Sequence, residues 1–286
     1  MMNATVRRPI IRYHGGKWKL ADWIVSHLPA HRVYVEPFGG AASVLMRKPR
    51  SYAEIYNDLD SELVNLFRVA RDEGDRLQRA LELTPFARDE FRLSYEHHDD
   101  PVEQARRTVA RAFMGFGTNA HNRATGFRAV SNASGTTPAH DWRNYPGGFA
   151  AIVQRLQGVV IENRDALDMM SAQDGPDTVF YVDPPYVPET RDRGWDYRFE
   201  MTLQDHEALS TFLHNVQGAV VLSGYASALY DRPYVDWRQV MSRAYADGGL
   251  VRTEVLWLSP RCPPSGLFDD WWPQTPNGGA GAGDEC

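Results

Sequence analysis

The stretch Thr178–Tyr186 (TVFYVDPPY) constrains the fold of this chain more than any other. Its first five residues are mostly apolar and rich in β-branched and aromatic side chains, which predicts a buried strand. The strand must end at Pro184 and Pro185, because proline has no N–H for the hydrogen-bonded ladder. Asp183 and Tyr186 therefore lie at the carboxyl end of a strand. In open α/β sheets ligands bind at that end, so we expect a binding site here.

The residue types at this strand end indicate a chemistry. Asp183 supplies a carboxylate that can only accept hydrogen bonds, and Pro184 supplies a carbonyl with no donor beside it. Tyr186 adds a flat ring. Two acceptors and a stacking surface suit a planar group that bears an NH2. The alternative interpretation is a strand that runs into a rigid turn with a packed tyrosine.

The chain has 286 residues, of which 43% are hydrophobic and 24% charged, as is ordinary for a soluble globular protein with one α/β core and a subdomain. No apolar run is long enough to span a membrane, and residues 1–8 lack the apolar segment of a secretory signal. Cys262 and Cys286 are too few for a disulfide framework and have no metal-ligand spacing. We therefore expect a cytoplasmic protein without a membrane association or a metal site.

The charge is distributed unevenly along the chain. The formal net charge of −6 argues against a protein that coats nucleic acid nonspecifically. From Gln104 to Gly148, however, six arginines accompany a single acid, Asp141. This segment predicts a localised surface that contacts phosphates. The alternative is a solvated arginine face of a helix.

Other strand patterns also end in glycines or acids. Residues 33–45 read as a strand, a Gly-Gly turn and the start of a helix, and the next strand ends at Asp58. A carboxylate at the end of the second strand of a mononucleotide-binding half typically binds ribose hydroxyls. The fingerprint Gly-x-Gly-x-x-Gly is absent, which disfavours a nicotinamide-dependent oxidoreductase.

With these motifs in this order, the chain resembles the DNA adenine methylases from about residue 13 to residue 257. The resemblance rests on YHGGK at 13–17, EPFGG at 36–40, Asp58, and DPPY at 183–186. It implies an α/β fold with a Rossmann-like methyltransferase sheet and an inserted, mainly helical DNA-recognition subdomain. It also implies S-adenosylmethionine as the cofactor and site-specific methylation of the N6 amino nitrogen of adenine in double-stranded DNA.

The resemblance also assigns residues to roles. The catalytic residues it implies are Asp183, Pro184, Pro185 and Tyr186. The cofactor-binding residues it implies are Tyr13, Lys17, Glu36, Phe38, Gly39, Gly40, Asp58, Asp165 and Asp183. Two assignments have alternatives: Asp60 could replace Asp58 at the ribose, and Asp165, like Asp60, could instead cap a helix.

In this mechanism Asp183 and the Pro184 carbonyl accept hydrogen bonds from the amino group of the target adenine. The adenine must be flipped out of the duplex, and we expect Tyr186 to stack on it. The loop at residues 188–199 is expected to order over the base.

The region between Asp58 and Thr178 corresponds to the target-recognition region of the family. Residues 114–128 are rich in Gly, Asn and Arg and predict a hairpin or loop that enters a DNA groove. The candidate DNA-binding residues are Arg111, Asn119, Asn122, Arg123 and Arg128. We expect a catalytic domain at 8–70 and 150–262, the insert at 71–149, and a flexible tail at 263–286. The hairpin departs from the family pattern, so it predicts no recognition sequence.

Alternative functions keep the fold and change the acceptor or lose the chemistry. They are methylation of adenine in RNA, methylation of the cytosine amino group in DNA, and a catalytically silent DNA-binding protein. An aspartate at position 183, where cytosine-specific enzymes more often have serine, favours adenine. No spare amphipathic stripe predicts an oligomer, so we expect a monomer.

Overall fold

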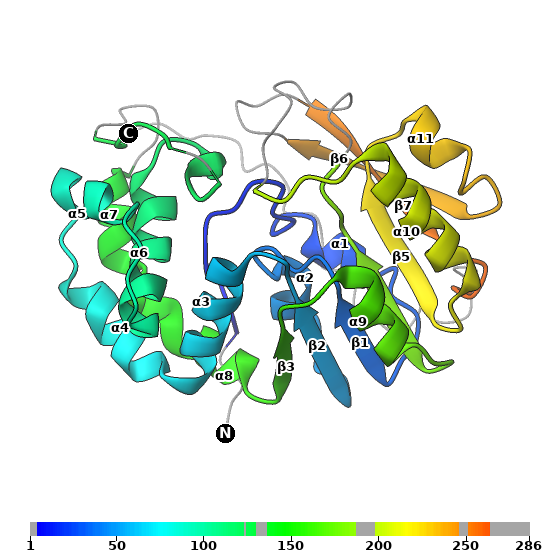
Figure 1. Ribbon diagram of the computed structural model, residues 1–286, viewed down its shortest axis with the longest axis horizontal. Helices are drawn as coiled ribbons and strands as arrows, with labels where there is room; N and C mark the ends of the chain where they lie inside the picture. Colours follow the sequence, from blue (N-terminus) through cyan, green and yellow to red (C-terminus); the bar gives the residue numbers. More distant parts are fainter. Residues whose placement is uncertain (1–4, 123, 130–135, 187–197, 246–250, 264–286) are drawn as a thin grey trace, which may run out of the picture.

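The computed structural model describes residues 5–122, 124–129, 136–186, 198–245 and 251–263. Its centre is a twisted β-sheet, which is seen with its helices in Figure 1. Within the described residues the strand order is β3-β2-β1-β4-β5-β7-β6. The strands are β1 (Val33–Glu36), β2 (Ala53–Asn57), β3 (Val159–Glu162), β4 (Thr178–Val182), β5 (Ala219–Gly224), β6 (Arg238–Tyr245) and β7 (Val251–Leu258).

The first five strands in this order are parallel, and β7 and β6 join them in antiparallel pairs. The order reverses beside β1, which pairs with β2 on one side and with β4 on the other. In parallel sheets such a switch point opens a crevice at the carboxyl ends of the strands. The motif at residues 183–186 directly follows β4, so the topology places it at this crevice.

Short helices cover both faces of the sheet, and the strands alternate their side chains between them. Tyr34, Val179 and Tyr181 pack in one apolar cluster, whereas Val35 and Phe180 pack in the other. The covering helices are α1 (Ala21–Val25), α2 (Ser43–Arg47), α9 (Ala166–Gln173), α10 (Leu203–Asn215) and α11 (Ala228–Asp231). Because both faces of the sheet are covered at its centre, β1, β4 and β5 have nearly continuous apolar sequences.

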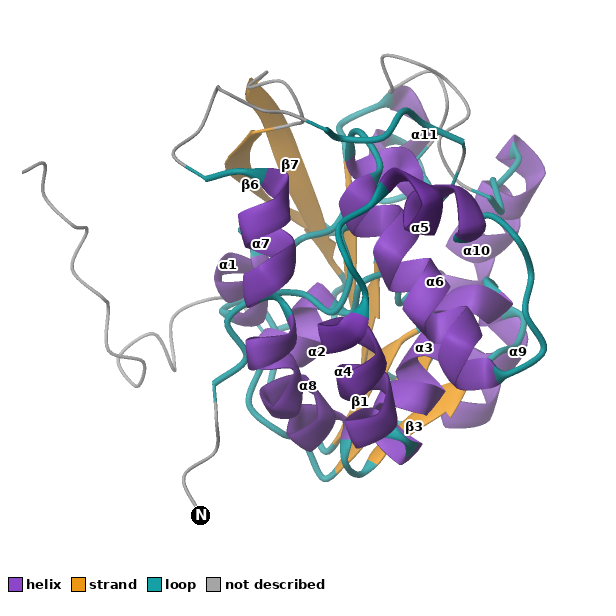
Figure 2. Cartoon of the chain, turned by 90° about the vertical axis from the view of Figure 1, so that its left-hand side faces the viewer, coloured by secondary structure: helices purple, strands orange, loops and turns teal. Residues whose placement is uncertain are grey.

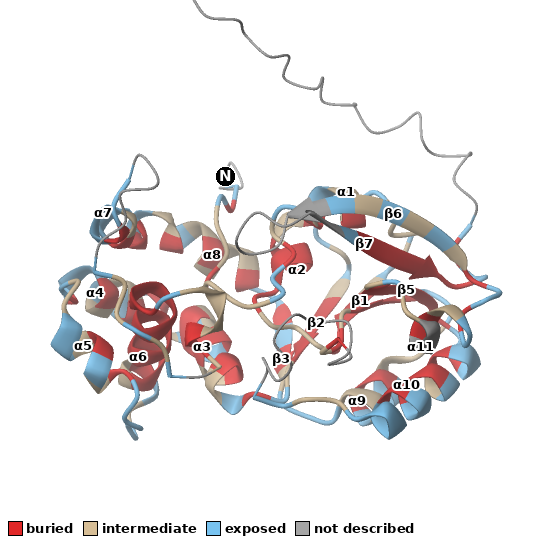
Figure 3. Ribbon diagram, turned by 90° about the horizontal axis from the view of Figure 1, so that it is seen from above, coloured by how far each residue is buried: buried red, intermediate tan, exposed pale blue. Residues whose placement is uncertain are grey.

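A group of helices packs beyond β3, and Figure 2 views the chain from their side. They are α3 (Ser61–Asp72), α4 (Gly74–Leu83), α5 (Arg88–Leu93), α6 (Pro101–Met114), α7 (Pro138–Asn144) and α8 (Phe149–Leu156). Short 3₁₀ turns lie at Thr118–Ala120 and Pro146–Gly148. Helix α6 is buried along most of its length between its neighbours (Figure 3).

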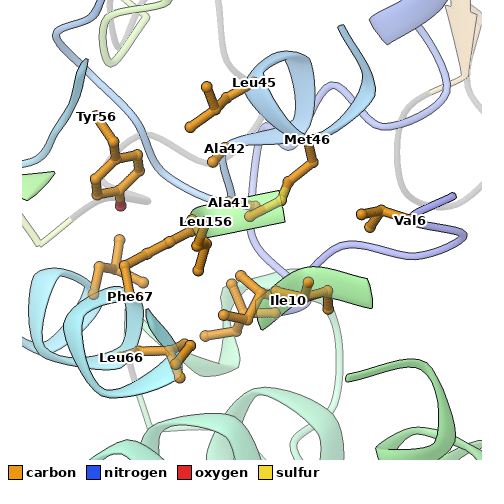
Figure 4. Close-up of a cluster of buried hydrophobic side chains, with 14 of the residues drawn as sticks. Val6, Ile10, Ala41, Ala42, Leu45, Met46, Tyr56, Leu66, Phe67 and Leu156 are labelled. Carbon is orange, nitrogen blue, oxygen red and sulfur yellow. The ribbon is translucent and has the colours of Figure 1, made fainter. Parts of the chain in front are cut away.

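The helical group and one face of the sheet share a single apolar cluster. Figure 4 shows part of it, in which Tyr56 of β2 lies beside Phe67 of α3 and Leu45 and Met46 of α2 lie nearby. The ring centroids of Tyr56 and Phe67 are 4.2 Å apart. The catalytic part and the predicted insert are therefore continuous in their packing. The predicted boundary at residue 70 falls inside α3, and the one at residue 150 falls inside α8.

Most predicted elements are present, including the strands at 33–36, 159–162, 178–182 and 219–224. Strand β6 was not predicted. Its side chains at positions 238–243 are all at least partly exposed, so its sequence has no apolar run.

None of the helices in the described part of the chain has the length and apolar character that a membrane span needs. The predicted tail begins at residue 263, and almost all of it lies outside the described residues.

Candidate active site

The glycine turn after β1 fits tightly against the end of β2. A Cβ atom on Gly39 would lie 2.1 Å from Cε2 of Tyr56, so no side chain fits there. The N–H of Gly39 donates to the carbonyl of Asn57 (2.8 Å), and the Tyr56 hydroxyl donates to the carbonyl of Gly40 (2.9 Å). Gly40 has a positive φ of 49°, which favours glycine. The turn therefore presents bare backbone to the space beside it.

Asp58 holds this turn from the end of β2. One carboxylate oxygen, Oδ2, accepts from the Gly40 N–H at 2.8 Å, and the other, Oδ1, accepts from the Asp60 N–H at 2.8 Å. Burial raises the pKa of Asp58 to about 6, although these backbone hydrogen bonds oppose the shift. A carboxylate has about four acceptor sites, so Asp58 can still accept a hydrogen bond from a ligand.

The Asp60 carboxylate is used within the protein. It caps α3 by accepting from the Glu62 N–H, and it accepts from Nε2 of His121 at 2.8 Å and from Nη1 of Arg198 at 3.2 Å. The side chain is buried. These contacts favour the helix cap over the alternative role at a ribose. Through His121, these contacts also connect the predicted recognition segment at residues 114–128 to Asp60, two residues after Asp58.

Glu36 ends β1 and points a carboxylate into the protein. Its Oε1 accepts from the Tyr34 hydroxyl at 2.8 Å and from the Leu45 N–H at 3.0 Å. Its Oε2 is buried and has no hydrogen-bond partner among the described residues. Burial raises the pKa of Glu36 to about 7. A buried oxygen without a partner is costly, so this atom is suited to a ligand that donates a hydrogen bond.

Asp183 follows β4 and pairs with Lys17 from the turn before α1. The distance from Nζ of Lys17 to Oδ1 of Asp183 is 3.1 Å, and the same Nζ donates to the carbonyl of Gly15 at 2.9 Å. The Tyr186 hydroxyl donates to the same oxygen of Asp183 at 3.0 Å. Sequence reasoning placed Lys17 beside the cofactor. The structure shows that its ammonium also neutralises part of the charge of the predicted catalytic acid.

Tyr186 differs from the expectation of an open stacking surface. Its side chain is only 4% exposed, and the Lys17 ammonium lies 4.7 Å from the ring centroid. The ring of Tyr225 contacts it edge-on at 4.8 Å. In this structure the ring is therefore covered. Stacking on a target base would require these contacts to rearrange.

One cavity of about 280 Å³ lies at the switch point between β1 and β4. It brings together every residue predicted to bind the cofactor, namely Tyr13, Lys17, Glu36, Phe38, Gly39, Gly40, Asp58, Asp165 and Asp183. Of the rest of the DPPY motif, Pro185 also lines it. Asp165 caps α9 by accepting from the N–H groups of Leu167 and Asp168, so both roles considered for it are compatible with its position.

Sequence reasoning missed other residues that line the cavity. They include Arg164, Ala166 and Leu167 beside Asp165, and Arg198, Phe199, Glu200 and Met201 before α10. The second group falls partly within the segment predicted to close over the target base. Residues 188–197 of that segment lie outside the described residues. The aromatic and charged composition of the segment was the only signal for it.

The structure is inconsistent with a DNA contact at Arg111. Arg111 is 6% exposed, forms an ion pair with Glu62, and donates from Nη1 to the carbonyl of Ser94 at 3.1 Å. Arg106 and Arg107 are also buried, and both pair with Glu103. These three arginines form interior ion pairs, so they do not contribute to a phosphate-binding surface.

Three of the other DNA-binding candidates, Asn119, Asn122 and Arg128, are partly exposed. Asn119 and Asn122 belong to the turn around residues 118–122. Nη2 of Arg128 lies 3.7 Å from Oδ2 of Asp141. Arg123 lies outside the described residues. Gly115 and Phe127 form an isolated antiparallel bridge, so the segment that carries these residues closes on itself as predicted for a hairpin or loop.

Comparison with known proteins identifies the family. The family model described as D12 class N6 adenine-specific DNA methyltransferase matches residues 13–244. The chain belongs to this family. The match includes the glycine turn and Asp58, which border the cavity, and the DPPY motif, of which Asp183 and Pro185 border it.

Three relatives are DNA adenine methylases. That of Serratia marcescens is 26% identical over 219 residues, which cover 73% of this chain and 78% of the relative. That of Escherichia coli strain K12 is 28% identical over 189 residues, or 63% of this chain and 66% of the relative. That of Salmonella typhi is 36% identical over 73 residues, or 26% of each chain.

Membership in the family confirms three predictions: the fold, the enzyme class and the methylation of adenine in DNA. It does not favour the alternatives of RNA adenine or DNA cytosine as the acceptor. The individual roles of the site residues, the cofactor and the domain boundaries remain predictions.

Proposed function

We propose that this methyltransferase binds S-adenosylmethionine in the cavity and methylates N6 of an adenine that is flipped out of double-stranded DNA at a specific site. We further propose that it acts as a monomer in the cytoplasm. The observation that carries the proposal is that the Asp183 carboxylate opens into the same cavity as the bare Gly39–Gly40 turn and the acids Glu36 and Asp58.

The residues of the cavity fit this cofactor. S-adenosylmethionine carries positive charge on its amino group and its sulfur, and the cavity is lined by several carboxylates. Oε2 of Glu36, which is buried and lacks a partner among the described residues, suits the amino group. Asp58 suits the ribose hydroxyls, and Asp165 suits the amino group of the cofactor's adenine. When bound, the cofactor supplies a methyl group on a positively charged sulfur.

The protein's contribution is to position the target amino group and stabilise its charge. Lys17 and Tyr186 both contact Oδ1 of Asp183, so we assign Oδ2 to the amino group of the target adenine. The Pro184 carbonyl accepts the second N–H. Two acceptors favour a pyramidal nitrogen with a directed lone pair, and they stabilise the positive charge that develops on it.

The pH dependence of turnover follows from Asp183. Burial raises its pKa to about 6; Lys17 lowers the pKa and Glu254 raises it. Because the carboxylate is the active form, kcat should be level above this pKa. Below it, kcat should decrease as the pH falls, and the decrease should approach about tenfold per pH unit. The test is kcat against pH from about 5 to about 8, with DNA and cofactor saturating so that titration of Glu36 and Asp58 does not limit binding. A pH-independent kcat over this range would contradict the assignment.

Cofactor binding tests the cavity separately from catalysis. Asp58→Asn should weaken S-adenosylmethionine binding by about 10- to 100-fold, the effect of losing a charged hydrogen-bond acceptor. Isothermal titration calorimetry without DNA measures it. The control is Asp177→Asn, an exposed residue just before β4, at the opposite edge of the sheet. The melting temperature of each variant shows whether it remains folded. Equal affinity in folded Asp58→Asn and wild-type protein would exclude Asp58 from the cofactor site.

A further inference from the structure

Glu254 is a buried acid in the otherwise apolar end of β7. It is 2% exposed, and Val255, Leu256 and Trp257 follow it in the strand. It lies beyond residue 244, where the match to the family ends. A buried carboxylate carries a large desolvation cost unless its hydrogen bonds are satisfied. Its partners therefore indicate what it does.

The described contacts of Glu254 lead to the DPPY site. Its Oε1 accepts from the Tyr186 hydroxyl and from the Ser223 hydroxyl, the latter at 2.8 Å. The same oxygen lies 3.7 Å from Nζ of Lys17. Tyr186 and Lys17 are also the two groups that contact Oδ1 of Asp183. Two carboxylates thus share one ammonium and one hydroxyl.

The sharing of these two donors determines how strong a hydrogen-bond acceptor Asp183 is. A tyrosine hydroxyl has a single proton and donates fully to one acceptor at a time. If the Tyr186 hydroxyl donates its hydrogen bond to Glu254, and Glu254 also attracts the Lys17 ammonium, Asp183 stays an electron-rich acceptor. If Glu254 were neutral, both donors would turn to Asp183 and weaken its attraction for an amino group.

We propose that Glu254 is a positioning residue for methyl transfer, which holds the Tyr186 hydroxyl and part of the Lys17 charge so that Asp183 remains available to the target amino group. This inference rests on the proposed role of Asp183. Among the described residues, the charged and titratable groups that face Asp183 are Lys17 from the turn before α1, Glu36 from β1, Tyr181 from β4, Tyr186 from the motif and Glu254 from β7. Of these, Glu36 and Glu254 are acids, and Glu254 is the one that contacts the same two donors.

The test is Glu254→Gln, which keeps the size and one acceptor oxygen but removes the charge. We expect kcat to fall by about 10- to 100-fold, the range for weakening one transition-state interaction. Calorimetric affinity for S-adenosylmethionine should stay within about twofold of the wild-type value. In the protein alone, carbon-13 NMR of labelled aspartate carboxyls should show Asp183 titrating at lower pH, because Glu254 raises its pKa. The matched control is Glu207→Gln, an exposed residue of α10.

Two further variants separate the possible outcomes. Glu254→Asp keeps the buried charge but shortens its reach, so kcat should fall by about three- to tenfold even if the glutamine variant does not fold. Asp183→Ala, measured in the same series, tests the proposed function itself. Wild-type turnover in Asp183→Ala would contradict the proposed role of Asp183. An inactive Asp183→Ala with normal kcat in the folded Glu254 variants would overturn the present inference. A lower kcat in Glu254→Gln with an unchanged Asp183 titration would also overturn it, because that result indicates only structural damage.

Discussion

Asp183→Ala is expected to lower the rate constant of methyl transfer by about two orders of magnitude or more, the scale of losing a key transition-state hydrogen bond. The protein should remain folded, because the Lys17 ammonium already lies 3.7 Å from Glu254 and keeps a buried partner. The measurement is single-turnover methyl transfer to DNA at saturating cofactor. The melting temperature shows whether the variant is folded, and the calorimetric affinity for the cofactor sets the concentration that saturates it. Turnover near the wild-type rate in a folded variant would exclude Asp183 as the acceptor for the amino group.

Glu54→Ala is expected to produce the largest loss of stability, about 3 to 5 kcal/mol, as is typical when one partner of a buried ion pair is removed. Glu54 lies in β2 and pairs with Nζ of Lys48 at 2.6 Å and with Nη1 of Arg155 at 2.6 Å. Glu54 and Lys48 are 3% and 4% exposed. Without Glu54, the two cations would remain buried next to each other and unpaired. Urea unfolding at neutral pH gives the free energy directly.

The control for Glu54 is Glu82→Ala on the exposed surface of α4, which should change stability by less than about 0.5 kcal/mol. Burial raises the pKa of Glu54, but hydrogen bonds and charges from Arg155 and Lys48 outweigh it and lower the pKa below the usual 4.5. The contribution of Glu54 is therefore fully present above pH 4.5 and is lost as the pH falls through the lowered pKa. A loss of less than about 1 kcal/mol in Glu54→Ala would show that the site relaxes or takes up water.

The sequence was most informative where the sheet is buried on both faces. Strands β1, β4 and β5 have continuous apolar runs, and the motif residues come directly after two of them. Parallel topology then brings these strand ends to one edge. For that reason nine cofactor candidates chosen from separate motifs line a single cavity. Strand β6 lacked this signal because the side chains at positions 238–243 are not buried.

The side-chain partners were beyond sequence reasoning because ion pairs connect distant positions. Arginines between Gln104 and Gly148 were counted as a basic surface, yet Glu103 lies just outside that window and Glu62 is far from it in sequence. The pairing of Lys17 with Asp183 likewise joins two motifs whose spacing carries no information about contact. Glu254 did leave a signal. A single acid in an apolar strand is rarely buried without a specific partner.

The central claim is methylation of adenine in DNA, and the most direct test is tritiated-methyl transfer from S-adenosylmethionine to unmethylated genomic DNA, with RNA in parallel. The labelled polymer is digested to nucleosides, and the modified positions are sequenced. The account predicts N6-methyladenine in DNA at one short sequence motif and no label in RNA. Label in RNA or on cytosine, or no label although the protein binds the cofactor, would contradict it.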